Sequence, residues 1–170
     1  TEFVKIMRIA EERKDIISLG PGEPDFDTPK HIRDFVKKQI DLGKTHYTSI
    51  SGLPEVRESF AKKLKLENRI DVDPESQIIV TTGSTEAIML SMMSLMDPGE
   101  SAIVPNPGYV AYTPIIDSIN GKPVYLQLKP EEGWEYDLDR VKKLVTKKTT
   151  LLILNSPSNP TGTVFSKKKL

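Results

Sequence analysis

Three short segments of this 170-residue sequence carry groups that suit the binding of a flat, charged small molecule. Residues 82–86 (TGSTE) open an apolar helical pattern, so their backbone NH groups are expected to be unpaired and to face an anion such as phosphate. Tyr109 has a rigid ring that could stack on a planar ligand. Asn159 begins the turn Asn-Pro-Thr-Gly, and its amide can both donate and accept hydrogen bonds.

Each segment also has a simpler interpretation that involves no ligand. Ser84 or Thr85 could merely cap a helix, because capping hydroxyls are common. Tyr109 could be a core tyrosine, and Asn159 could serve the turn itself. Each segment, however, follows an expected strand, and open α/β sheets bind ligands at the carboxyl ends of their strands. The three together favour one flat ring that bears a phosphate and an oxygen.

The elements that would position these segments follow from short apolar runs that alternate with helical patterns. Strands are expected at 78–81, 102–104, 124–128 and 151–154. Helices are expected at 84–96, 110–119 and 137–145, the last with Asp137 as its cap. Repeated strand–helix units predict an α/β fold with a mostly parallel sheet and helices on both faces.

The first part of the sequence has a different pattern. Residues 1–14 place apolar side chains at helical spacing between charges, which predicts a short amphipathic helix. Residues 16–26 predict a brief strand and then a loop rich in Gly and Pro. A helix is expected from Thr28 and Pro29, with the Thr28 hydroxyl as its cap, up to Gly43. Another is expected from Pro54 to about Leu66.

Composition bounds the class of protein. An apolar fraction of 37% and a charged fraction of 28% fit a soluble globular domain. The 24 basic and 24 acidic residues balance, so neither nucleic acid nor a membrane surface is expected as a partner. Apolar runs are too short for a membrane span, and a cytoplasmic location is expected. Cysteine is absent, and His31 and His46 are the only imidazoles, so no metal site is expected.

Taken in order, these motifs resemble the first part of a class I/II aminotransferase of the fold type I pyridoxal-phosphate enzymes, a group that includes bacterial and archaeal aspartate aminotransferases. The matching segments are 20–29, 47–53, 82–87 and 155–162. The resemblance implies an N-terminal arm and small-domain segment over residues 1–45. It implies the N-terminal part of the cofactor-binding large domain, with its sheet incomplete, over residues 46–170.

The resemblance also implies a site for pyridoxal 5′-phosphate. Gly83, Ser84 and Thr85 would hold its phosphate, and Tyr109 would stack on its pyridine ring. Asn159 would bond both the ring oxygen and the carboxylate of the substrate.

Two further residues take roles from the resemblance. Gly22 would let its backbone approach the substrate carboxylate, because glycine has no side chain to obstruct a ligand. Tyr47 would reach the phosphate in the neighbouring subunit, which implies a homodimer. A half-exposed loop aromatic is the simpler interpretation of Tyr47. His31 and His46 match no catalytic position of the family.

The implied reaction is the transfer of an amino group from an amino acid to a 2-oxo acid. In this family the catalytic lysine, the acid beside the pyridine nitrogen and the arginine that binds the substrate carboxylate all follow the Asn-Pro-Thr-Gly turn. No catalytic residue is therefore expected within the chain. We expect the chain to be the amino-terminal portion of a longer enzyme, rather than a natural truncation, and to be poorly stable by itself.

The sequence does not identify the amino acid that donates the amino group. Some members that prefer dicarboxylates have a lysine where this chain has Thr85, so aspartate is not assigned as the substrate. A β-lyase or synthase of the same fold would share the cofactor site and differ in downstream residues. The non-enzymatic alternative is a regulatory protein whose aminotransferase-like domain senses a ligand.

Overall fold

The computed structural model describes residues 2–13, 15–17, 20 and 22–167. The chain forms two units, residues 1–48 and residues 49–170. The assignment of residues 1–45 to an arm and small-domain segment, and of residues 46–170 to a cofactor-binding domain, stays a prediction.

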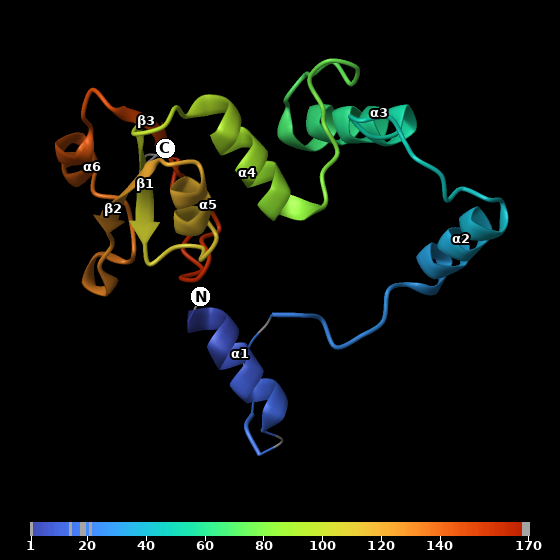
Figure 1. The fold of residues 1–170 in the computed structure, drawn as a ribbon, viewed down its shortest axis with the longest axis horizontal. Coiled ribbons are helices and arrows are strands. Elements are labelled where there is room, and N and C mark those ends of the chain that lie inside the picture. The colour runs from blue at the N-terminus through green and yellow to red at the C-terminus, as the bar shows by residue number, and fades with distance from the viewer. Residues whose placement is uncertain (1, 14, 18–19, 21, 168–170) are drawn as a thin grey trace. The chain divides into compact units, whose positions relative to one another are not determined.

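The first unit contains helices α1 (Glu2–Glu12) and α2 (Lys30–Asp41) (Figure 1). Both helices lie where the apolar spacing predicts them. The predicted hydroxyl cap of α2 was wrong, because Pro29 occupies the N-cap position and no side chain caps the helix. Thr28 lies one residue too early to reach the unpaired NH groups of the first turn.

A brief strand was expected to begin at Ile16. Ile16 lies in a bend and Ile17 has no regular structure, so this prediction was wrong for both residues. The remainder of the expected strand, Ser18 and Leu19, lies outside the described residues. A strand is stabilised by hydrogen bonds to a neighbouring strand, and the only sheet among the described residues is formed by the second unit.

The described residues of the second unit form four α-helices, three strands and two short irregular helices (Figure 1). The α-helices are α3 (Pro54–Lys63), α4 (Gly83–Leu95), α5 (Tyr112–Ser118) and α6 (Leu138–Leu144). The strands are β1 (Ser101–Asn106), β2 (Lys122–Gln127) and β3 (Thr149–Leu152). A π-helix (Leu64–Asn68) extends α3, and a 3-10 turn (Pro130–Glu132) follows β2.

The sheet has the order β2-β1-β3, and both pairs of strands are parallel. Ile103 at the centre of β1 lies opposite Val124 on one side and Leu152 on the other. The predicted parallel α/β fold is confirmed. The predicted strand at 78–81 was wrong, because the NH of Val80 donates to the carbonyl of Ser51 in a turn (3.0 Å) rather than to a neighbouring strand.

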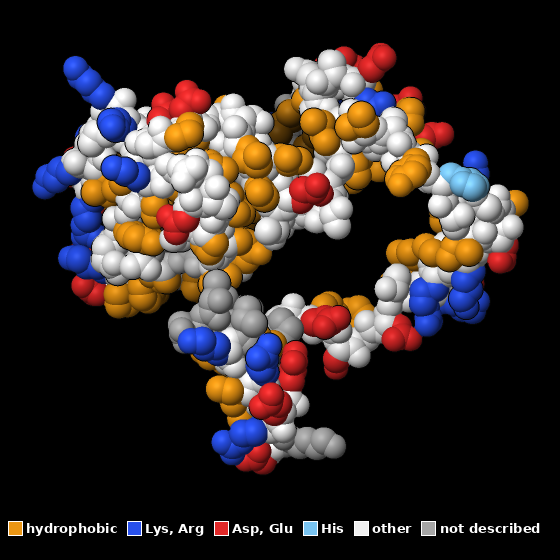
Figure 2. Space-filling view, viewed as in Figure 1, with side chains coloured by type: hydrophobic (Ala, Val, Ile, Leu, Met, Phe, Trp, Pro, Cys, Tyr) orange, Lys and Arg blue, Asp and Glu red, His pale blue; other side chains and the backbone are white. Residues whose placement is uncertain are grey.

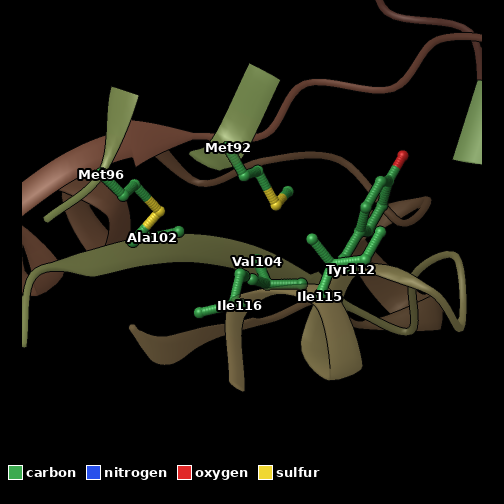
Figure 3. Close-up of a cluster of buried hydrophobic side chains, with 7 residues drawn as sticks. All are labelled: Met92, Met96, Ala102, Val104, Tyr112, Ile115 and Ile116. Atoms are coloured by element: carbon green, nitrogen blue, oxygen red, sulfur yellow. The ribbon is translucent and has the colours of Figure 1, made fainter. Parts of the chain in front are cut away.

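Alternate residues of β1 point to opposite faces of the sheet, as strand geometry requires. Ala102 and Val104 pack beneath α4 and α5. Figure 3 shows this cluster, with the thioethers of Met92 and Met96 above β1. From α5 the cluster takes Tyr112, Ile115 and Ile116.

Ile103 points to the other face and is fully buried there. Its cluster contains Leu126, Leu128, Tyr136, Val141 of α6 and Phe165. Helices therefore cover both faces of the sheet, as predicted, with α4 and α5 on one face and α6 on the other.

Helix α6 begins with the cap that the sequence predicts. The carboxylate of Asp137 accepts hydrogen bonds from the NH groups of Asp139 (2.9 Å) and Arg140 (3.3 Å). These bonds, with Arg140 first, lower the pKa of Asp137 below its ordinary value. Because the folded-state pKa is lowered, the cap stabilises the fold above the unfolded pKa, and this contribution is lost as the pH falls through the folded value.

Helix α4 has a second apolar side that is exposed. Its apolar residues there are Met89, Leu90 and Met93. Figure 2 shows apolar side chains at the surface in the region of α4. None of the helices in the described part of the chain is long and apolar enough to cross a membrane. Among the same residues no group of three His, Cys, Asp or Glu side chains could hold a metal ion.

Tyr136 leads to a prediction about alkaline pH. Its hydroxyl donates to the carbonyl of Ile153 (2.8 Å), its ring packs edge-on against Phe165 (4.9 Å between centroids), and burial raises its pKa to about 12. An unfolded tyrosine titrates near pH 10, so the stabilisation is complete below pH 10 and is lost as the pH rises toward 12. Between about pH 9 and about pH 11 this loss is about 1 kcal/mol.

Denaturant unfolding of the full-length protein at these two pH values measures the loss. Tyr136→Phe removes the titrating group, so the variant is expected to lose about 1 kcal/mol less than the parent protein over the same interval. Equal losses in the two proteins would show that Tyr136 does not carry the effect.

Candidate functional site

Parallel strands end at the same edge of a sheet, and this edge collects two of the predicted segments. The loop with Tyr109 follows β1, and the turn with Asn159 follows β3, which is the neighbouring strand. At the end of β1, the amide of Asn106 donates to the side-chain oxygen of Gln127 (2.8 Å) and so ties β1 to the end of β2. The carboxyl edge is the position where open α/β sheets bind ligands.

Tyr109 joins this edge to helix α4. Its hydroxyl lies 3.2 Å from Oγ1 of Thr85, at hydrogen-bonding distance. Its half-buried ring packs edge-on against Tyr112, with centroids 5.5 Å apart and planes at 81°. Tyr112 is buried in the core, and burial together with the neighbouring Tyr109 raises its pKa. The structure thus brings together two of the residues that the sequence singles out, Thr85 and Tyr109.

The first turn of α4 differs from the expectation that all its NH groups are unpaired. The NH of Thr82 donates to the carboxylate of Glu86, and the NH of Gly83 donates to the carbonyl of Thr81 (2.9 Å). Gly83 has a φ of +80°, which favours glycine at this position. Within the described residues the NH groups of Ser84 and Thr85 have no acceptor. These two NH groups can bind an anion at the positive end of the helix dipole.

The turn after β3 is closed by its own backbone. The NH of Ser158 donates to the carbonyl of Thr163 (2.9 Å), and the NH of Gly162 donates to the carbonyl of Ser158 (2.8 Å). Gly162 takes a φ of +71°. The side chain of Asn159 is exposed, and among the described residues its amide has no hydrogen-bond partner. The turn therefore does not depend on this amide, which leaves it available to a ligand.

Gly22 and Tyr47 lie in the first unit. A Cβ atom added at Gly22 would meet no atom within 4 Å, so its backbone is open to approach. The side chain of Tyr47 is fully exposed in this chain. Their roles at the cofactor and at a second subunit stay predictions.

Two residues that support the site were missed by sequence reasoning. Tyr112 packs against the ring of Tyr109, and Glu86 caps the N-terminal end of α4. The sequence signal for this cap is weak, because the usual capping pattern has its acidic residue three positions after the N-cap, whereas Glu86 lies four positions after Thr82. The contact between Tyr109 and Tyr112 has no comparable signal, because residues three apart meet here through a loop and not along one helix.

The donor set fits pyridoxal phosphate. Two unpaired NH groups and a hydroxyl at the start of a 13-residue helix suit the phosphate. The half-buried ring of Tyr109 suits a flat heterocycle, and the free amide of Asn159 can donate to an oxygen on that ring.

Comparison with known proteins identifies the family of the chain. Residues 14–170 match the family described as aminotransferase class I and II. An aspartate aminotransferase of Pyrococcus abyssi is 45% identical over the whole chain, which covers 44% of that protein. A probable aspartate aminotransferase of Methanocaldococcus jannaschii is 49% identical over 92% of the chain and 41% of that protein.

Solved structures give the same result. An aromatic aminotransferase from Pyrococcus horikoshii superposes with a TM-score of 0.87 at 43% identity, over 96% of this chain and 44% of that one. The chain spans less than half the length of these relatives. The match over residues 14–170 and the shared fold show that the chain belongs to the aminotransferase class I and II family.

Proposed function

We propose that the protein containing this chain transfers an amino group from an amino acid to a 2-oxo acid, with pyridoxal 5′-phosphate as its cofactor. The observation that carries the proposal is the contact of Thr85 with Tyr109, because it joins an anion-binding helix terminus to an aromatic plate at the carboxyl edge of the sheet. The membership of the family and the names of the relatives support the same activity.

The residues of this chain would bind and orient the reacting groups. The NH groups of Ser84 and Thr85 would hold the phosphate, while Gly83 would supply the left-handed turn that aims them at it. The ring of Tyr109 would fix the plane of the cofactor. Asn159 would bond the ring oxygen and the substrate carboxylate. The role that the resemblance implies for Gly22 is part of the proposal, and its backbone is open to the approach of a carboxylate. When bound, the cofactor supplies an electron sink for cleavage of a bond at the substrate α-carbon.

Other parts of the site would come from elsewhere in the assembly. We propose that the lysine that binds the cofactor aldehyde is supplied by sequence beyond Leu170. We also propose a homodimer in which the exposed Tyr47 reaches the phosphate of the neighbouring subunit. A cytoplasmic location is part of the same proposal.

Product analysis with the full-length protein tests the proposed reaction. Aspartate, phenylalanine and a β-substituted amino acid are each mixed with the protein, pyridoxal phosphate and 2-oxoglutarate. We expect glutamate together with the 2-oxo acid of at least one donor. Ammonia and pyruvate without glutamate would instead indicate a β-lyase. Failure to take up the yellow cofactor would contradict the proposal.

A further inference from the structure

The hydroxyl groups of Thr85 and Tyr109 form a contact that ring stacking alone does not require. Their oxygens are 3.2 Å apart, and either hydroxyl could be the donor in the chain as described. Stacking uses the face of the tyrosine ring and would be served equally by phenylalanine. Stacking on the cofactor therefore does not explain why residue 109 has a hydroxyl group.

We infer that these two hydroxyls form an ordered hydrogen-bond chain that ends on the cofactor phosphate. Tyr109 donates to Oγ1 of Thr85, and Thr85 donates to a phosphate oxygen. This inference rests on the proposed function. It makes Tyr109 a positioning residue for the phosphate group, in addition to its place beside the ring.

The direction of the chain follows from the number of protons on each group. A phosphate monoester is mostly dianionic at pH 7, because its second pKa is about 6, so its oxygens can only accept hydrogen bonds. Threonine has one hydroxyl proton and two lone pairs. If Thr85 gives its proton to the phosphate, a lone pair remains to accept the proton of Tyr109. The opposite order would leave Thr85 with no proton for the phosphate.

The core of the second unit fixes the spacing of the two hydroxyls. Thr85 lies on α4, and the same helix anchors Met92 in the buried cluster. Tyr109 packs edge-on against Tyr112, which belongs to the same cluster. Both hydroxyls are thus attached to elements that one core holds together. A preorganised donor pair loses little conformational freedom when the phosphate binds.

This chain of bonds has a consequence for selectivity. A cofactor analogue without phosphate, pyridoxal, can still stack on Tyr109 but cannot use the hydroxyl pair. Loss of either hydroxyl should therefore weaken the binding of pyridoxal phosphate and leave the binding of pyridoxal unchanged. A purely structural role of Tyr109 would affect both molecules equally.

The test measures dissociation constants of the full-length apoprotein for both molecules by fluorescence titration. Thr85→Val is expected to lower the preference for pyridoxal phosphate over pyridoxal by about tenfold or more, the usual worth of a hydrogen bond to a charged group. Tyr109→Phe removes a hydrogen bond between two neutral hydroxyls and is expected to lower the same preference by about threefold to tenfold. Thr85→Ser keeps a hydroxyl and should keep most of the preference. The double variant Thr85→Val with Tyr109→Phe should lose no more of this preference than Thr85→Val alone, because Thr85→Val already breaks the link between Tyr109 and the phosphate.

The chain offers a matched control. The hydroxyl of Tyr125 on β2 also lies 3.2 Å from a threonine hydroxyl, that of Thr113 on α5. Tyr125→Phe removes the same kind of contact and should leave the preference unchanged. Circular dichroism measures whether each variant is folded. If Tyr109→Phe does not fold, Thr85→Val tests the inference independently.

Three results would overturn the inference. Tyr109→Phe could weaken the binding of both molecules equally, it could change neither, or the effects of the two single substitutions could multiply in the double variant. In each case a wild-type protein that still binds pyridoxal phosphate leaves the proposed function intact. A wild-type protein that binds no pyridoxal phosphate would overturn both.

Discussion

Replacing Gly108 with alanine is expected to weaken the binding of pyridoxal phosphate to the full-length protein by more than about tenfold, because the change moves Tyr109. A Cβ atom at Gly108 would lie 2.4 Å from the carbonyl oxygen of Pro105 and 3.1 Å from its Cγ. The first contact is far too short, and its partner is backbone in the buried strand β1. The turn between β1 and Tyr109 would have to open, which also costs about 1–3 kcal/mol of stability.

Equilibrium titration with pyridoxal phosphate measures this effect, and Gly99→Ala provides the control. Gly99 has a φ of +86° and no atom within 4 Å of an added Cβ. An alanine there costs about 1 kcal/mol through backbone strain and is not expected to change the affinity for the cofactor. A folded Gly108→Ala variant with wild-type affinity would show that the turn does not position Tyr109.

Replacing Ile103 with alanine is expected to destabilise the protein by about 2–5 kcal/mol. Ile103 has no exposed surface and lies at the centre of the middle strand. It packs among the side chains that join the sheet to α6, including Tyr136 and Val141. Truncation removes the transfer free energy of its methyl groups and leaves a cavity that a parallel sheet with helices on both faces cannot easily close.

Comparison of the valine and alanine variants at position 103 tests this prediction quantitatively. Ile103→Val removes one methylene group and should cost about 0.5–1.5 kcal/mol, well below the cost of alanine. Denaturant unfolding of the full-length protein and both variants gives the free energies. Equal midpoints for all three proteins would mean that the cluster around Ile103 does not limit the stability of the sheet.

Local patterns in the sequence predicted much of the second unit. The period of the apolar residues placed α4, α5, α6 and all three observed strands, because burial of one face of each element follows from its own residues. The cap at Asp137 was predicted for the same reason, since a cap and the NH groups that it satisfies lie within three residues.

Features that depend on distant residues were not predictable. The run 78–81 is apolar enough for a strand, but a strand also needs a neighbour, and Val80 bonds to a turn at Ser51 instead. Thr85 and Tyr109 are 24 residues apart, and only the packing of α4 and α5 on the same face of β1 brings their hydroxyls together. The unpaired backbone NH of Ser84 follows from helix geometry. The hydrogen bond from the NH of Thr82, in contrast, depends on the conformation of the Glu86 side chain.

The central claim is that one cofactor joins the start of α4, Tyr109 and Asn159, and a crystal structure of the full-length protein with pyridoxal phosphate tests it most directly. We predict phosphate oxygens within about 3 Å of the NH groups of Ser84 and Thr85. We also predict the pyridine ring against the face of Tyr109, with its oxygen at the amide of Asn159. A phosphate bound away from α4, or a ring that does not contact Tyr109, would contradict the account.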